Sequence, residues 1–282
     1  MSLQNLDATL PIGLDRREKA FGASLRRAAP QAVGRFLARY GLLLSFLLLW
    51  HVASTLRWVN PSVFPPLDVI ASAFWRGLTK GTLAADLGIS LQRSGLAFAA
   101  AVAVSIPLGL FMGQIRAVER ALDPILQLFR QTSALALYPV FILLLGLGEL
   151  SKVFVIFWAT SFPLLLSTIG GVKEVEPKLI EMARVYGASR LAVFTRVVLP
   201  GALPSIFVGL RLSATMALLM LIASEMIGAN QGLGFQVMNA QFNFQIPLMF
   251  SAIFMLAVLG LLANYAIVSL QRRLCRWSVA SS

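Results

Sequence analysis

Long apolar stretches, separated by short segments that carry most of the charge, dominate the pattern of this chain of 282 residues. A helix needs about 20 mostly apolar residues to cross the hydrocarbon core of a bilayer. Six stretches approach that length, so we expect an all-α, polytopic membrane protein with about six transmembrane helices. The predicted spans are residues 40–56, 94–113, 131–147, 153–172, 206–227 and 246–270.

The composition supports a membrane protein and excludes several kinds of chemistry. Hydrophobic residues make up 58% of the chain and charged residues only 13%, about half the charged share of a soluble domain. The single His51 and the single Cys275 exclude an internal disulfide and a metal site built from clustered histidines or cysteines. No phosphate-binding loop of the type G-x-x-x-x-G-K-[ST] occurs, so any ATP must be hydrolysed by another chain.

The basic residues predict the orientation of the spans. The chain has 24 Lys and Arg residues against 12 Asp and Glu residues. With the N-terminus in the cytoplasm, 17 of the 24 fall in the inner segments, as the positive-inside rule requires. Because they flank apolar runs instead of forming one dense patch, we expect no nucleic-acid partner. The predicted organisation is a cytoplasmic tail (1–39), a transmembrane domain (40–270) and a second cytoplasmic tail (271–282).

The longest predicted outer segment, residues 57–93, opens with a proline-rich run. The prolines at positions 61, 65 and 66 interrupt any helix there. An amphipathic run over residues 67–78 predicts a helix that lies along the membrane interface.

The inner connection between the fourth and fifth spans, residues 173–204, is predicted to be structured. Gly187 follows an amphipathic run and suits the positive φ of a helix C-cap. A second helical run, residues 189–198, is expected to end at Pro200. A helix, a glycine turn and a second helix on the inner face indicate a docking site. The residues that form one apolar face of the first helix are Leu179, Met182, Ala183 and Tyr186.

This connection resembles the EAA signature of ATP-binding-cassette (ABC) importer permeases. Glu181-Met182-Ala183 is followed after three residues by Gly187, and after nine more by Val197-Val198-Leu199-Pro200. Gly209-Leu210-Arg211 and other short motifs resemble the type I subfamily that imports taurine, aliphatic sulfonates, nitrate or bicarbonate. The resemblance extends over roughly residues 60–275.

The resemblance implies a transport subunit that has no catalytic residue and binds no cofactor of its own. In this family two permease subunits pair, and each inserts a coupling helix into a dimeric ATPase that holds ATP and Mg²⁺. For this chain we expect the pair to be a homodimer. A periplasmic or lipoprotein solute-binding protein delivers the solute, and the complex lies in the lipid of the bacterial inner membrane. Glu181 is implied to contact a basic residue of the ATPase. The implied coupling residues are Glu181, Met182, Ala183, Arg184, Tyr186, Gly187, Ala188, Ser189, Leu199 and Pro200.

Polar residues within or beside the spans are candidates for the translocation pathway. Hydrogen bonds to the backbone or to neighbouring helices are the structural alternative for each of them. A carboxylate inside a span, such as Glu225, is a functional candidate by default. Because it would repel an anionic solute, we favour a bond from Glu225 to the loop 228–234. The candidates are Arg130, Gln131, Thr132, Ser133, Ser213, Thr215, Met220 and Glu225.

Two other functions are weighed against an ATP-driven permease. A secondary transporter would need no ATPase and is typically built from inverted repeats with buried carboxylates. An intramembrane hydrolase would use Ser189 as nucleophile and His51 as base, within about 3 Å of one another. The predicted topology places Ser189 in an inner loop and His51 toward the outer side of the first span, which disfavours the hydrolase.

Overall fold

The computed structural model describes residues 41–277, and all regular secondary structure within that range is helical. The all-α prediction is therefore confirmed. The predicted N-terminal tail and the last five residues of the predicted C-terminal tail, 278–282, lie outside the described residues. The chain divides into two compact units, Met1–Leu67 and Asp68–Ser282.

The described part of the first unit is one apolar helix and the loop that follows it. The helix Gly41–Thr55 occupies the first predicted span but is shorter than a full crossing. The proline-containing loop folds back onto this helix. Trp50 Nε1 donates to the carbonyl oxygen of Pro65 (3.2 Å), and Ser54 Oγ donates to that of Phe64 (2.5 Å).

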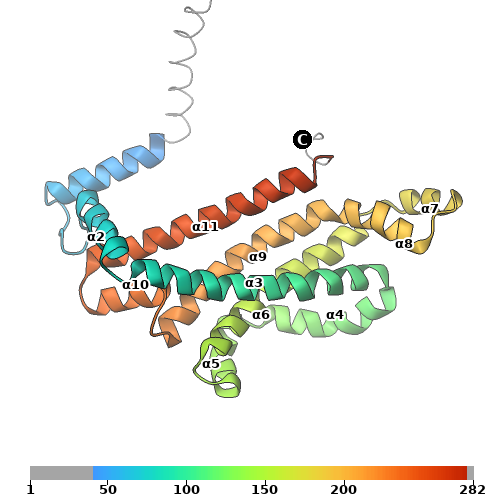
Figure 1. Ribbon diagram of the computed structural model, residues 1–282, viewed down its shortest axis with the longest axis horizontal. Coiled ribbons are helices and arrows are strands. Elements are labelled where there is room, and N and C mark those ends of the chain that lie inside the picture. The colour runs from blue at the N-terminus through green and yellow to red at the C-terminus, as the bar shows by residue number, and fades with distance from the viewer. Residues whose placement is uncertain (1–40, 278–282) are drawn as a thin grey trace, which may run out of the picture. The chain divides into compact units, whose positions relative to one another are not determined.

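The second unit is a bundle of long helices with shorter helices at its two ends (Figure 1). The predicted amphipathic helix over residues 67–78 is confirmed as α2. A short helix, α10, lies in the segment between the last two spans. In chain order the elements are α2 (Leu67–Thr79), α3 (Leu83–Gln114), α4 (Arg116–Gln131), α5 (Ala134–Leu145), α6 (Glu149–Lys173), α7 (Pro177–Val185), α8 (Arg190–Val193), the π-helical turn η1 (Phe194–Val198), α9 (Leu199–Gly228), α10 (Leu233–Phe242) and α11 (Ile246–Leu274).

Helices α3 and α6 pack closely because glycines on α3 leave room for side chains of α6. A Cβ atom on Gly109 would lie 2.7 Å from Thr168 Cβ, and one on Gly113 would lie 2.7 Å from Val172 Cβ. Small residues at such positions let helix backbones approach in a membrane, where packing supplies most of the association energy. Since the two contacts follow the same order along both helices, α3 and α6 run parallel.

Helix α9 runs antiparallel to α6. Near the end of α6, a Cβ atom on Gly171 would lie 2.8 Å from Ser205 Cβ. Further along α9, Ser213 Oγ donates to the carbonyl oxygen of Thr160 (2.8 Å), which comes earlier in α6. Helix α11 is antiparallel to α9 in turn, since Arg211 Nη2 donates to Gln271 Oε1 (2.7 Å) near its end.

The third predicted span, residues 131–147, is confirmed only over residues 134–145, which form the shorter helix α5. Helices α4 and α5 meet at a bend of 97°, and Thr132 and Ser133 between them have extended backbones (ψ 124° and 122°). With 12 residues, α5 is about 18 Å long and too short to cross a bilayer alone. Because α3 and α6 are parallel, the chain must return from one end to the other between them. Helices α4 and α5 together therefore form one broken crossing.

Four of the other predicted spans are confirmed as long apolar helices. These are α3, α6, the continuous helix Arg190–Gly228 and α11. By length and composition the described residues thus contain four crossings, or five with the broken pair.

The predicted helix end at Pro200 is wrong. Helix α8, the π-turn η1 and α9 follow one another without a break, as one helix of 39 residues. Pro200 lies in the first turn of α9, and the N–H of Leu199 donates to the carbonyl oxygen of Phe194, five residues earlier. The wider π-turn lets the helix pass a residue that has no N–H and would otherwise clash with the preceding turn.

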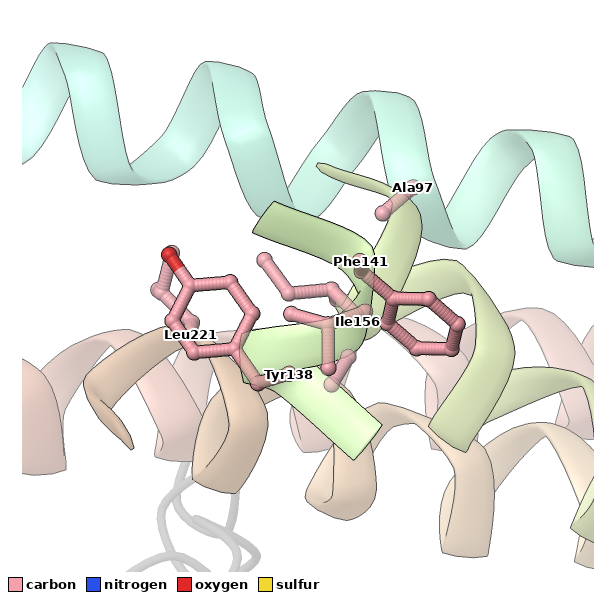
Figure 2. Close-up of a cluster of buried hydrophobic side chains, with 7 residues drawn as sticks. Ala97, Tyr138, Phe141, Ile156 and Leu221 are labelled. Carbon is pink, nitrogen blue, oxygen red and sulfur yellow. The ribbon is translucent and has the colours of Figure 1, made fainter. Parts of the chain in front are cut away.

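A buried apolar cluster joins α5 to the central helices. Figure 2 shows Tyr138 and Phe141 of α5 beside Ile156 of α6, Leu221 of α9 and Ala97 of α3. Tyr138 is only 1% exposed, and its hydroxyl donates to the carbonyl oxygen of Ser224 on α9 (3.4 Å). This packing fixes the position of α5 and hence the bend that precedes it.

Candidate functional site

The turn between α7 and α8 has the hydrogen bonds of a Schellman C-cap. Gly187 has a φ of +76°, as the sequence predicts. Its N–H donates to the carbonyl oxygen of Arg184 (2.9 Å), and the N–H of Ala188 donates to that of Ala183 (3.0 Å). Ser189 then caps α8, since its hydroxyl oxygen accepts from the N–H of Ala192 (3.2 Å). These bonds fix the direction in which the chain reverses.

One side of α7 anchors it to the ends of α6 and α9. Ile180, Ala183 and Ala188 pack against a buried cluster that includes Val172 of α6 and Ala202 of α9. The predicted apolar face of α7 is therefore divided. Ala183 faces the body of the protein, whereas the other three members of that face are exposed.

The opposite side of α7, with the start of α8, presents large apolar side chains to solvent. We call this set the α7–α8 surface; its members are Leu179, Met182, Val185, Tyr186 and Leu191. Val185 and Tyr186 are each 85% exposed. The carboxylate of Glu181 beside them is exposed and forms no ion pair with another described residue. An exposed apolar patch beside an unpaired charge is typical of a protein–protein docking site.

The predicted coupling residues fall into two groups. The residues on α7 and in the turn that follows it lie together and are mostly exposed. The other two residues lie in the continuous helix 190–228 and do not belong to the α7–α8 surface. The exposed members are Glu181, Met182, Arg184, Tyr186, Gly187 and Ser189; Ala183 and Ala188 are half-buried against the body; Leu199 and Pro200 are half-buried in α9.

At the other end of the bundle, where α10 lies in Figure 1, Glu225 is held in a buried network. The side chain of Glu225 has no exposed surface. Its carboxylate accepts from Ser90 Oγ (2.8 Å), Arg93 Nη1 (2.8 Å) and the N–H of Gly234 (2.8 Å). The favoured interpretation, a bond to the loop 228–234, agrees with this geometry.

Arg93 connects three helices and a loop within this network. Its Nε and Nη2 donate to the two carboxylate oxygens of Glu149 on α6 (2.5 and 2.7 Å). Its Nη1 donates to Glu225 on α9 and to the carbonyl oxygen of Gln231 (2.7 Å). Sequence reasoning missed this role of Arg93. Its position directly before the apolar run 94–113 was a signal, but its acidic partners lie far away in the chain.

The other pathway candidates are not gathered into one site. Arg130, Gln131, Thr132 and Ser133 lie together at the bend between α4 and α5, as the end of α4 and the two residues after it. On α9, Ser213 is buried in its bond to α6, Thr215 Oγ1 donates to the carbonyl oxygen of Arg211 (3.2 Å), and Met220 packs against the buried cluster of Figure 2. The hydroxyls of Ser213 and Thr215 are thus used within the bundle.

Comparison with known proteins places the chain in a family. Residues 105–276 match the family described as "Binding-protein-dependent transport system inner membrane component". The chain is 36% identical over 244 residues to SsuC of Escherichia coli (strain K12), a permease named for aliphatic sulfonates. This alignment covers 86% of this chain and 93% of that protein. It is 36% identical over 242 residues to the taurine transport system permease protein TauC of the same organism, covering 84% and 88%. It is 30% identical over 271 residues to the bicarbonate transport system permease protein CmpB of Synechocystis, covering 91% and 95%.

Solved structures share the fold at low sequence identity. An inward-facing structure of the MetNI methionine ABC transporter matches with a TM-score of 0.58 and 18% identity, over 68% of this chain and 95% of that chain. A bacterial alginate ABC transporter matches with a TM-score of 0.55 and 17% identity, over 86% and 97%.

The chain forms a bundle of apolar helices with a helix–turn–helix at one end, and the relatives that it matches are permeases. Together these findings define a membrane permease. The chain belongs to the family of binding-protein-dependent transport system inner membrane components. It is the permease subunit of a binding-protein-dependent ABC importer.

Proposed function

We propose that the α7–α8 surface docks onto a separate ATPase subunit and transmits its movement to the bundle. The observation that carries this proposal is a rigid turn that holds an exposed apolar patch beside the unpaired Glu181. ATP would be hydrolysed on the partner, and this chain would contribute no ATPase site. Glu181 would form a charge-assisted contact with a basic residue of the ATPase.

The charge distribution supports a cytoplasmic position for this surface. The ends of α3, α6 and α11 and the start of α9 lie at the α7–α8 end. At the opposite end the second unit has Arg76, Lys80, Arg93 and Lys152, and the last two are both paired with Glu149. By the positive-inside rule the α7–α8 end is then cytoplasmic, in the inner membrane of a bacterium, and so is the C-terminus. The basic residues at that end are Arg116, Arg120, Lys173, Lys178, Arg184, Arg190, Arg196, Arg272 and Arg273.

Substitutions on α7 test the docking role. Glu181→Lys reverses the unpaired charge and should abolish ATP-driven uptake and co-purification of the ATPase, while insertion and thermal unfolding stay unchanged. Glu176→Lys makes the same reversal at the start of α7 and serves as the matched control. Normal uptake by the Glu181→Lys variant would reject the proposal.

We infer that the solute is a small anion of the sulfonate, taurine, nitrate or bicarbonate type. The names of three relatives support this class. A periplasmic or lipoprotein binding protein would deliver the solute, and two copies of this chain would form the pathway, because closed twofold symmetry is the commonest oligomeric arrangement. The bend at Arg130–Ser133 is the candidate pathway segment whose side chains lie at a helix break.

The cognate binding protein gives the sharpest test of the solute. Its thermal unfolding should shift upward with one member of a panel of taurine, alkanesulfonates, nitrate, bicarbonate and aromatic acids. Stabilisation only by a solute that carries no anionic group would contradict the assignment and leave the docking proposal intact.

A further inference from the structure

A cavity of about 560 Å³ lies where α7 and α8 meet the ends of the long helices. Its apolar wall includes Val172 of α6, Ile180 of α7 and Phe194 of η1. Arg184 of α7 and Arg190 of α8 also line it. The volume falls within the usual range for small-molecule sites, about 300–1,000 Å³. An apolar wall with two guanidinium groups fits a ligand that is both anionic and apolar.

The two arginines have no acidic partner in the described part of the chain. No ion pair or side-chain hydrogen bond involves Arg184 or Arg190 among the residues that the structure describes. Lys173 at the same end, by contrast, is paired with Glu119. The cavity therefore contains positive charge that the rest of the described chain does not neutralise.

The helices that border the cavity indicate its position along the membrane normal. Gly113 and Val172, which both line it, are the last residues of charge-free apolar runs in α3 and α6. Beyond them the chain turns polar, with Gln114 and Lys173. The cavity thus lies at the level where hydrocarbon gives way to lipid headgroups.

The cavity and the α7–α8 surface are on different sides of α7. Ile180 and Arg184, four residues apart, line the cavity. Met182 and Val185, three residues apart, are exposed members of the α7–α8 surface and do not line it. A ligand in the cavity is therefore compatible with a protein docked on the other side of the helix.

We propose that this cavity binds one anionic phospholipid. The headgroup phosphate contacts Arg184 and Arg190, and an acyl chain lies against Val172, Ile180 and Phe194. Basic pockets between helices at the cytoplasmic side of a membrane are suited to anionic headgroups. A free inorganic anion would gain nothing from the apolar wall. The bound lipid bridges α7 to the ends of α3 and α6 and so stabilises the position of the helix that carries the α7–α8 surface.

Native mass spectrometry of the intact importer, purified in mild detergent, tests the proposal. The wild-type complex should retain one anionic phospholipid per permease subunit. The double variant Arg184→Gln/Arg190→Gln should lose it, with binding of phosphatidylglycerol weakened about 30-fold by the loss of two charge contacts. The matched control, Lys178→Gln/Arg196→Gln, removes two exposed charges from α7 and η1 that do not line the cavity, and should retain the lipid.

Thermal unfolding of the delipidated complex distinguishes a lipid headgroup from free inorganic phosphate as the source of the anion. Short-chain phosphatidylglycerol should stabilise the wild type, whereas short-chain phosphatidylcholine and inorganic phosphate should not. Equal stabilisation by phosphate alone would overturn the assignment to a lipid. So would undiminished lipid retention by the Arg184→Gln/Arg190→Gln variant. If that variant kept the lipid but released the ATPase, the two arginines would belong to the protein interface, and the proposal would be rejected.

Discussion

Single charged residues hold one end of this bundle together. Glu225 is completely buried and accepts hydrogen bonds from α3 and from the start of α10. Arg93 in turn bonds Glu149 and the loop carbonyl of Gln231. Removing one partner of a buried ion pair leaves the other charge without compensation, which costs far more than breaking an exposed pair.

Glu225→Ala should lower the free energy of unfolding by about 3–5 kcal/mol, because it leaves the N–H of Gly234 without its acceptor and removes one of the two carboxylates that Arg93 contacts. Thermal unfolding in detergent measures the effect. Glu119→Ala is the control, since it breaks the more exposed pair with Lys173 and should cost at most about 1 kcal/mol. Equal losses in the two variants would contradict the structural role of Glu225.

Cys275 gives a pH-dependent readout at the end of α11. Burial raises the pKa of its thiol, so the reactive thiolate is scarce at neutral pH. Maleimide labelling of the native protein should be slow and should accelerate as pH rises or on unfolding. Burial favours the neutral thiol, so at pH values below the unfolded-state pKa of Cys275 this preference stabilises the folded protein fully. The stabilisation is lost as the pH rises through the folded-state pKa. Because Cys275 is the only cysteine in the sequence, all labelling reports on this site.

At the scale of elements, glycines decide how closely the long helices pack. The approach of α3 to α6 depends on the absence of a side chain at Gly109 and Gly113. Proline has a smaller effect than expected, because the π-turn η1 carries the helix past Pro200 without a break.

Gly109→Ala should destabilise the protein by about 1–3 kcal/mol, because the new Cβ would overlap Thr168 and push α3 from α6. Gly95→Ala makes the same change on the same helix where nothing lies within 4 Å, and should be neutral or slightly stabilising. Thermal unfolding of both variants measures the difference. Indistinguishable unfolding temperatures would show that the close approach contributes nothing.

For the whole molecule, the order of helix contacts gives the topology. Parallel α3 and α6, with α9 antiparallel to α6 and α11 antiparallel to α9, require the broken α4–α5 crossing and place α10 and α7 at opposite ends (Figure 1). Helix α7 packs directly on the ends of α6 and α9, through Ile180 and Ala183.

Cysteine accessibility tests this topology in a Cys275→Ser background. The two labelling sites are Lys80→Cys, just before α3, and Arg190→Cys, at the start of α8. Both positions are exposed, and they lie at opposite ends of the bundle, the first at the α10 end and the second at the α7–α8 end. A membrane-impermeant maleimide applied to intact cells should label the first and not the second. Labelling of both from one side would refute the arrangement.

The sequence by itself determined the helical class, four of the long crossings, the amphipathic α2 and the turn at Gly187. Each of these depends on local causes, namely apolar run length, periodicity and the backbone freedom of glycine. The family signature was also local, since its residues lie within about twenty positions along one connection.

Only the tertiary structure decided the features that depend on distant partners. The bend at Thr132–Ser133 is fixed by the packing of Tyr138 against α9, which no local pattern records. Arg93 and Glu225 were visible as charges, but their pairing needs the parallel and antiparallel order of the helices. The cavity lined by Arg184 and Arg190 likewise exists only because α7 and α8 fold back onto the ends of α3 and α6. Contacts between residues distant in sequence depend on how whole helices pack, and hydropathy along the chain carries no information about that packing.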